Sequence, residues 1–386
     1  MKKWKSELVL AALLLPVLLS IWTVAQSPTP ADAIALEQQG KLSEAAQAWR
    51  AVTARNPHDA AAFASLGVVL SKEQKYQEAA VAYKRALALN PRLPGVELNL
   101  GLAEFKQGHF KSAAVALQAA LTSDPSNNQA RTLLGLSYYG SQQFDKAVKY
   151  LESAAKSDPS NIELHRVLAQ SCLWAKDYSC ARDEFRQLLQ QNPESAAAHV
   201  LMGEALDGLG RTSEAIAEFE AAAKISPSEP NVHFGLGYLY WKSHQDDEAK
   251  KQFQQELAID PGNAQSLAYL GDIEWKGDHP DEALALLKRA LSAQKNIRII
   301  YVDLGAIYLQ QKNYAQAHEA LLNAVALDPN LPDAHYQLGR LYQAQGKTAD
   351  AEKELHKVQE LHKKAEDSLV GKIASSPPPM NPPEDQ

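Results

Sequence analysis

The apolar and small residues of this chain recur at helical spacing. Within residues 298–331 they lie three or four residues apart in two runs, Tyr301, Leu304, Gly305 and Tyr308, then Tyr314, Ala317, Leu321 and Ala324. Residues at this spacing share one face of a helix. The Asp328-Pro329 pair ends the second run, because proline has no N–H to donate and restricts the residue before it. The pattern predicts two short helices within 34 residues.

This pattern returns every 34 residues along most of the chain. Eight copies end at proline, namely Pro57, Pro91, Pro125, Pro159, Pro193, Pro227, Pro261 and Pro329, and one ends at Lys295. The second helix always keeps an alanine: Ala45, Ala79, Ala113, Ala147, Ala181, Ala215, Ala249, Ala283, Ala317 and Ala351. One helix pair cannot bury its apolar faces alone, so the copies should stack on one another. We therefore expect an all-α solenoid of about ten helix-turn-helix repeats.

Most copies also place a Leu-Gly pair in the first helix. These pairs begin at Leu66, Leu100, Leu134, Leu236, Leu270, Leu304 and Leu338. We expect each glycine to face the alanine of the second helix, because two small residues let helix axes approach more closely than large ones do.

These residues resemble the tetratricopeptide repeat family, which carries leucine-glycine at positions 7 and 8, alanine at 20 and proline at 32. The resemblance implies a right-handed α-solenoid. It covers a weakened first copy, residues 26–59, and nine further copies: 60–93, 94–127, 128–161, 162–195, 196–229, 230–263, 264–297, 298–331 and 332–365. The last copy lacks its closing proline, so its second helix should continue over residues 366–373 as a cap. Residues 374–386, which hold five prolines, should form a disordered tail.

The N-terminal residues differ from the repeats. Lys2, Lys3 and Lys5 precede an almost wholly apolar run from Leu8 to Trp22, and small residues follow as far as Ala25. This order is typical of a secretory signal peptide over residues 1–25, cleaved near Ala25. The alternative is an uncleaved membrane anchor, because the apolar run is nearly long enough to span a bilayer. We expect an exported protein, periplasmic or secreted, or one anchored by this segment.

Charge and motifs exclude several kinds of site. The net charge of -7 argues against a nucleic-acid partner. There is no Gly-Lys-Ser or Gly-Lys-Thr phosphate loop, and His318-Glu319 lacks the second histidine of a metalloprotease pair. Four histidines, His165, His199, His233 and His335, hold position 4 of their copies, where we expect them to replace the aromatic packing residue of the family. We expect no catalytic residue, no cofactor and no metal; an enzyme is the least favoured reading.

The two cysteines, Cys172 and Cys180, lie at positions 11 and 19 of one copy. The resemblance implies that position 11 faces the second helix of its pair, so a disulfide across the pair is geometrically allowed. An exported chain would favour that bridge. The alternative is two reduced thiols packed as small apolar groups. Two thiols alone are too few for the four ligands of a structural zinc site.

The resemblance also implies a concave groove lined by the first helices, into which positions 2, 5, 9, 12 and 13 point. Here those positions offer these candidate partner-binding residues: Phe105, Tyr139, Trp174, Phe234, Tyr238, Trp241 and Trp275. Exposed aromatic residues on a concave surface are typical of partner recognition. The alternative is that they pack on one another. The basic clamp and the asparagine ladder found in some family members are both missing, since only Arg166 and Asn99 match them.

These observations favour a non-catalytic scaffold that binds an extended or helical segment of a protein or peptide partner. An alternative is a membrane-tethered scaffold for cell-envelope assembly or polysaccharide export, with membrane contact only if residues 1–25 are retained. The sequence specifies neither the partner nor the oligomeric state.

Overall fold

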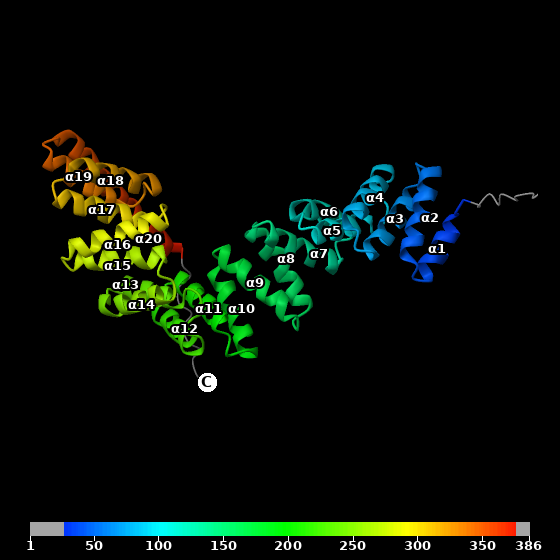
Figure 1. Cartoon of the computed structure of the whole chain (residues 1–386), viewed down its shortest axis with the longest axis horizontal. Helices are drawn as coiled ribbons and strands as arrows, with labels where there is room; N and C mark the ends of the chain where they lie inside the picture. The colour runs from blue at the N-terminus through cyan, green and yellow to red at the C-terminus, as the bar shows by residue number, and fades with distance from the viewer. Residues whose placement is uncertain (1–26, 376–386) are drawn as a thin grey trace, which may run out of the picture. The chain divides into compact units, whose positions relative to one another are not determined.

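The computed structural model describes residues 27–375, and within these residues it contains twenty helices and no strand (Figure 1). The expectation of an all-helical chain built from helix pairs is confirmed. The expected signal peptide, residues 1–25, and residues 376–386 of the expected tail lie outside the described residues. No helix among residues 27–375 is both long enough and apolar enough to cross a bilayer.

The chain divides into two compact units: the first ends at Ser141, and the second begins at Gln142. The helices of the first unit are α1 (Pro30–Gln38), α2 (Leu42–Arg55), α3 (Ala60–Lys72), α4 (Tyr76–Leu89), α5 (Val96–Lys106), α6 (Phe110–Ser123) and α7 (Asn128–Gly140). The first helices of the second unit's repeats are α9 (Ile162–Trp174), α11 (Ala196–Gly208), α13 (Val232–Lys242), α15 (Ala264–Lys276), α17 (Arg298–Gln310) and α19 (Pro332–Ala344). Its second helices are α8 (Phe144–Ser157), α10 (Tyr178–Gln191), α12 (Thr212–Ile225), α14 (Asp246–Ile259), α16 (Pro280–Ala293), α18 (Tyr314–Leu327) and α20 (Thr348–Ser375).

Local sequence explains where these helices begin and end. Asn263 starts α15 as a cap, because its side-chain oxygen accepts the N–H of Ser266 at 2.9 Å. In α5 and α13 the start is delayed, since Gly95 and Asn231 adopt left-handed backbone just before the helix. The last helix, α20, runs to Ser375, two residues beyond the expected end of the cap at residue 373.

The turns between paired helices share one feature that the sequence pattern did not reveal. Each places a residue with positive φ at position 15 of its copy: Gly40, Gln74, Gly108, Gln142, Lys176, Gly210, His244, Asp278, Lys312 and Gly346. Left-handed backbone costs a non-glycine residue about 1–2 kcal/mol. Packing of the two helices therefore imposes this turn even where glycine is missing.

Glycine at position 8 does permit close approach, but its partner differs from the one expected. A Cβ atom placed on Gly237 would lie 2.6 Å from the ring of Phe253, and one on Gly305 would lie 2.5 Å from Leu321. Both partners stand at position 24, not at the conserved alanine. The alanine contributes its backbone, as Ala283 does with a carbonyl oxygen 3.5 Å from the Cβ position of Gly271. The expected glycine-alanine contact is thus corrected: a large side chain of the second helix occupies the gap that glycine leaves.

The first helices of successive copies approach one another more closely than the second helices do. In the second unit, α9, α11, α13, α15, α17 and α19 each contact the next in this series, and in the first unit α3, α5 and α7 do so. Among the described residues, no second helix makes a comparable contact with the next second helix. Each unit is therefore concave on its first-helix side. We call this side of the second unit the inner face; Figure 1 shows α13, α15, α17 and α19 following one another along it.

The contact between Gly237 and Phe253 gives a test of the packing. Gly237→Leu should lower the thermal midpoint and destabilise the second unit by about 1–3 kcal/mol, because its side chain would overlap the Phe253 ring. Circular dichroism melts would measure the change. Ala197→Leu, at an exposed position of α11, adds similar bulk without a buried contact and should leave the melt unchanged. An unaltered midpoint for Gly237→Leu would contradict the packing argument.

Candidate functional site

The predicted groove residues lie in several places. Phe105 is on α5 and Tyr139 on α7, both half-buried in the first unit. Trp174 ends α9 and is 49% exposed. Its ring centroid lies 4.9 Å from that of Phe144, and the centroid of Phe105 lies 5.5 Å from that of Phe110. Phe105 and Tyr139 belong to the first unit, whereas Trp174 and the candidates on α13 and α15 belong to the second.

The structure does bring together the three candidates on α13. Ring centroids lie 6.3 Å apart for Phe234 and Tyr238 and 5.9 Å apart for Tyr238 and Trp241, with both pairs stacked. Tyr269 of α15 joins them, 4.7 Å from Trp241 and 5.5 Å from Tyr238, both edge-on. Phe253 of α14 lies beneath, stacked 5.8 Å from Tyr269. We call these five residues the aromatic cluster. The seven centroid distances among these rings, from 4.7 to 6.3 Å, fall in the favourable range for aromatic contacts.

Apart from Phe253, which is fully buried, the members of the aromatic cluster are half-buried. Trp275, the remaining candidate, is also half-buried, but it packs toward the apolar core that α15, α16 and α17 share. The cluster thus presents partly exposed aromatic surface between α13 and α15, with Trp275 at the end of α15.

A buried carboxylate fixes the helix that carries most of this cluster. The cap residue of α13, Asn231, makes no side-chain hydrogen bond to the helix. Instead Glu256 of α14 accepts the N–H of Phe234 at 3.1 Å, which satisfies one of the free donors at the helix start. Glu256 stands at position 27, where several other copies have alanine, such as Ala290 and Ala324. Its bond ties the start of α13 to its paired helix.

A second buried carboxylate holds the far end of the cluster. Asp272 of α15 is 3% exposed and accepts the indole N–H of Trp241 at 2.6 Å. Lys276 donates to the same oxygen at 2.7 Å, and its ammonium nitrogen lies 5.0 Å from the centre of the Trp241 ring. The ammonium therefore pairs with a carboxylate and an aromatic face together, as in a cation–π arrangement.

Asp303 of α17 is buried without such pairing. It is 5% exposed, and its Oδ2 atom is enclosed without a hydrogen-bond partner. Burial raises the pKa of the Asp303 carboxyl well above 3.8, and the negative charges of Asp272 and Asp333 add to this, whereas Lys276 opposes it. The charges that act on Asp303 thus come from α15 and α19, which are both first helices. Asp303 thus stands on the middle one of three neighbouring first helices, because α17 contacts both α15 and α19.

Asp333 of α19, unlike Asp303, is paired with a cationic side chain. The guanidinium of Arg298 donates to both of its oxygens, at 2.8 Å for Nη1 to Oδ2. Burial alone would raise the pKa of Asp333, but the hydrogen bonds and the charge of Arg298 outweigh it and hold this pKa below its usual value. Of the three aspartates, Asp303 alone thus has no cationic side chain bound to it in the structure.

The hydroxyl of Tyr269 remains protonated at neutral pH. Burial, with the nearby Tyr238 and Asp272, raises the pKa of Tyr269 to about 12. The aromatic cluster therefore contributes neutral rings and hydroxyl groups, and the charge of this region comes from the aspartates and Lys276.

The sequence reasoning missed Tyr269, Asp272 and Asp303. A signal for the aspartates was nevertheless present. Asp272, Asp303 and Asp333 occupy positions 9, 6 and 2 of three successive copies, which are the kinds of position searched for a basic clamp. The basic clamp of the family carries lysine, arginine or asparagine at such positions, whereas this chain carries aspartate.

The two cysteines are joined in the structure. The sulfur atoms of Cys172 and Cys180 lie 1.99 Å apart, and their Cα atoms lie 5.7 Å apart. The bridge links α9 to α10, the two helices of one pair. Cys172 is fully buried and Cys180 is half-buried, so the bridge lies between the two helices.

The histidines at position 4 lie in the packing between helices. His165, His199 and His335 each place Nδ1 2.6 Å from a glutamate oxygen of the second helix in the same copy. In His199 and His335 the other ring nitrogen, Nε2, forms a hydrogen bond with the carbonyl oxygen of the proline that closes the preceding copy. No group of three or more His, Cys, Asp or Glu residues within residues 27–375 is placed to hold a metal ion.

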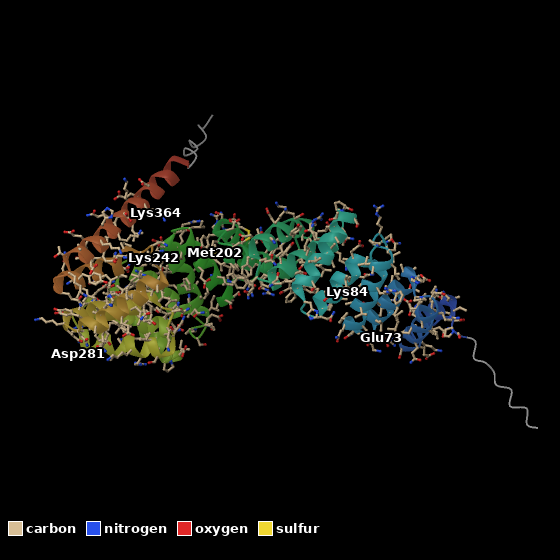
Figure 2. The ribbon with its side chains drawn as sticks, turned by 90° about the horizontal axis from the view of Figure 1, so that it is seen from above. Glu73, Lys84, Met202, Lys242, Asp281 and Lys364 are labelled. Atoms are coloured by element: carbon tan, nitrogen blue, oxygen red, sulfur yellow. A yellow bond between two sulfur atoms is a disulfide. The ribbon has the colours of Figure 1, made fainter. Side chains whose placement is uncertain are left out.

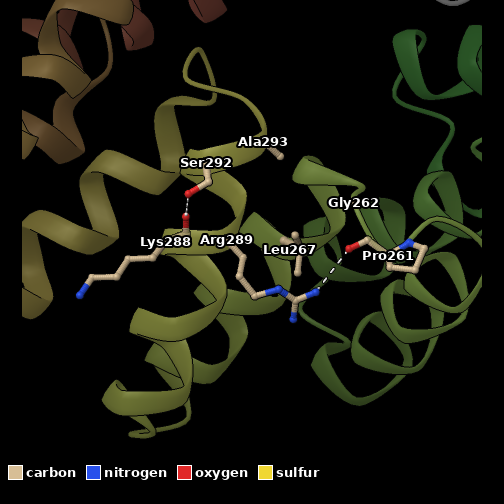
Figure 3. Close-up of a pocket in the computed structure, with 7 residues that line it drawn as sticks. All are labelled: Pro261, Gly262, Leu267, Lys288, Arg289, Ser292 and Ala293. Atoms are coloured by element: carbon tan, nitrogen blue, oxygen red, sulfur yellow. Dashed lines mark hydrogen bonds between the residues drawn. The ribbon is translucent and has the colours of Figure 1, made fainter.

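Charged side chains elsewhere in the second unit also join helices. Lys242, labelled in Figure 2, donates to Asp207 at 2.7 Å across α13 and α11, and this hydrogen bond raises the pKa of Lys242. A cavity of about 480 Å³ lies where one copy meets the next. Arg289 lines it and donates to the carbonyl oxygen of Pro261 at 3.3 Å, an interaction drawn as a dashed line in Figure 3. Arg85 donates to the carbonyl oxygen of Pro57 in the same way. The Arg289 guanidinium thus holds the junction between two copies, and we assign this cavity a packing role.

Comparison with known proteins gives matches along most of the chain. Family models described as tetratricopeptide repeat match residues 31–94, 98–162 and 234–298, residues 138–203 and 173–233, and residues 333–365. A model described as TPR repeat matches residues 305–346. No curated protein matches the sequence.

Solved structures give similar matches. The chain resembles a structure titled as the APC/C hetero-tetramer Cut9-Hcn1, with 15% identity and a TM-score of 0.52 over 86% of this chain and 80% of that chain. This likeness shows the fold alone. A structure titled MamA MSR-1 C2 matches with 27% identity and a TM-score of 0.39, over 43% of this chain and 95% of that chain.

The state of Asp303 gives a prediction for stability. The folded chain keeps a proton on Asp303 at pH values where the unfolded chain has lost it, so its stability should fall as pH rises from about 3.8 through the raised pKa. Asp303→Asn removes this loss and should stabilise the second unit by about 1–3 kcal/mol at neutral pH. The difference should vanish near pH 3.

Thermal melts of the wild type and Asp303→Asn at several pH values would measure this effect. Asp281→Asn, on an exposed part of α16, makes the same chemical change at the surface and should have little effect. If Asp303→Asn instead destabilised the protein at neutral pH, Asp303 would be a packing residue.

Proposed function

The chain belongs to the tetratricopeptide repeat family, and on that premise we propose that it is a non-catalytic scaffold that binds a segment of a partner protein on the inner face. Arrays of this family act in protein interaction and are generally non-catalytic. The observation that carries the proposal is the aromatic cluster, which leaves part of several large rings exposed on the side where the first helices converge.

The chemistry of the aromatic cluster suits partner binding. Tyrosine and tryptophan contribute large contact areas with few rotatable bonds, and they are common among the residues that dominate binding energy. Here Tyr238, Trp241 and Tyr269 offer apolar ring surface, and Asp272 and Lys276 add charged groups at its edge. A segment that covered these rings would remove apolar area from water, which stabilises a complex.

The cluster is also fixed before any partner arrives. Glu256 holds the start of α13, and Asp272 holds the indole of Trp241. Residues fixed in advance lose less conformational entropy on binding, so more of the contact energy contributes to affinity. Packed helices lie about 8–10 Å apart, which is close to three residues of an extended chain at about 3.3 Å each. A partner in extended conformation would therefore meet successive first helices with every third side chain.

We further propose that the protein acts after export from the cytoplasm. Support comes from the basic and apolar order of residues 1–25 and from the disulfide between Cys172 and Cys180, a bond that persists in oxidising compartments. Cleavage near Ala25 would release the protein, whereas retention would anchor it to the membrane.

The aromatic surface can be tested by substitution. Trp241→Ala combined with Trp275→Ala should reduce crosslinked capture of partners from native cell envelopes at least tenfold, because two large apolar contacts are lost. The helical circular dichroism signal of the double variant should stay close to that of the wild type, since both tryptophans are only half-buried. Mass spectrometry of the captured proteins would give the readout.

Val115→Ala provides the matched control. Val115 is 74% exposed on α6, a second helix, and its loss should leave capture unchanged. Equal capture by the double tryptophan variant and the wild type would refute binding at the aromatic cluster.

The proposed export can be tested at the N-terminus. The chain produced in a cell with an export pathway should begin near Gln26, which Edman sequencing or intact mass would detect. A chain that begins at Met1 and stays with the membrane fraction would instead support the anchored form. A chain that begins at Met1 and stays in the cytoplasm would contradict export.

A further inference from the structure

We infer that the partner segment carries a lysine or arginine side chain, and that its positive charge is bound by Asp303 on the inner face. This inference rests on the proposed function, because it names the chemistry of the segment that the scaffold binds. It adds a charged contact to the apolar contacts of the aromatic cluster.

The pairing of charges among the first helices leaves one acidic group unmatched. Lys276 binds Asp272 at 2.7 Å, and Arg298 binds Asp333 at 2.8 Å. Asp303 lies within electrostatic reach of both aspartates and of Lys276, yet its enclosed Oδ2 atom accepts no hydrogen bond. The free protein thus has an unused acceptor at the junction of α15, α17 and α19.

Such an acceptor is costly for the free protein. A buried carboxyl group without a partner loses the hydrogen bonds that water would give it, and its charged form is further disfavoured by two nearby aspartates. A residue that only filled space at this position would not need an acidic group. A bound cation removes the cost, because it supplies both a hydrogen-bond donor and the opposite charge.

The depth of Asp303 indicates which cation can reach it. Asp303 is 5% exposed as a residue and its Oδ2 atom is enclosed, so a cation has to reach this carboxyl group from outside the helix packing. Lysine and arginine carry their charge at the end of a long apolar stem, which can extend into such a site while the partner's backbone stays outside. Lys276 shows this arrangement within the protein, since its ammonium reaches the buried Asp272 and lies over the ring of Trp241.

Other occupants fit these residues less well. An acidic peptide would be repelled by the three aspartates, and the chain as a whole carries a net charge of -7. A metal ion needs several ligands at short range, and within residues 27–375 no group of His, Cys, Asp and Glu offers them. A small organic amine would satisfy Asp303 but would leave the aromatic cluster uncovered. A polypeptide with a basic residue and apolar neighbours satisfies both.

The test uses a random 12-residue peptide library displayed on phage and selected on the full-length chain. Peptides that also bind the Trp241→Ala, Trp275→Ala double variant are discarded. We expect the remaining peptides to share a lysine or arginine beside apolar residues. Each enriched peptide is then synthesised twice, once as selected and once with norleucine in place of the basic residue, because norleucine keeps the apolar stem and removes the charge.

Calorimetric titration then measures both peptides against the wild type, Asp303→Asn and the control Asp281→Asn. For the wild type and Asp281→Asn, the basic peptide should bind roughly ten- to a hundredfold more tightly than its norleucine analogue. For Asp303→Asn the two peptides should bind within about twofold of each other. The norleucine comparison tests the charge in the unmodified protein, so the inference stays testable even if Asp303→Asn fails to fold.

The possible failures are distinguishable. One failure is a set of enriched peptides that need the two tryptophans for binding but contain no basic residue. Another is a set that keeps its full affinity when norleucine replaces the basic residue. Either result would overturn the inference and leave the proposed function standing. The same holds if the norleucine replacement lowers the affinity equally for the wild type and for Asp303→Asn. If spermidine bound as tightly as the best peptide in an Asp303-dependent manner, the occupant would be a polyamine and not a polypeptide. If no peptide depended on the tryptophans, both the inference and the proposed function would fail.

Discussion

The seating of a large side chain on a glycine of the paired helix determines how this protein is built. The ring of Phe253 occupies the space where Gly237 has no side chain, and leucine or tyrosine does the same in other copies. This contact sets the separation of the two helices in a pair. Because it recurs every 34 residues, each pair has nearly the same shape and can stack on the next in the same way.

Equal pairs stacked in this way bring the first helices closer together than the second helices. On the inner face, side chains from α13, α15 and α17 therefore meet, and some polar ones become buried between them. Asp272 is stabilised there by Trp241 and Lys276, whereas Asp303 is left without a hydrogen-bond partner at Oδ2. The same convergence thus creates the aromatic cluster and the unpaired acidic group beside it.

The second helices contribute to this surface indirectly. Phe253 supports Tyr269 from below, and Glu256 binds the N–H of Phe234 and so fixes the start of α13. Glu256 replaces the alanine that many copies have at this position, so a departure from the repeat pattern marks the pair that carries the cluster. Departures from a repeat are informative here because the repeat itself accounts only for stacking.

The sequence by itself determined the all-helical fold, the register of the copies and the place of Phe234, Tyr238 and Trp241 on one helix face, because helical spacing is a local property of the chain. Only the tertiary structure decided that a position-24 side chain fills the glycine gap, that Tyr269 joins the cluster, and that Asp303 is buried without a partner. These outcomes depend on which side chains meet across helices far apart in sequence, and the periodic pattern contains no information about those distances.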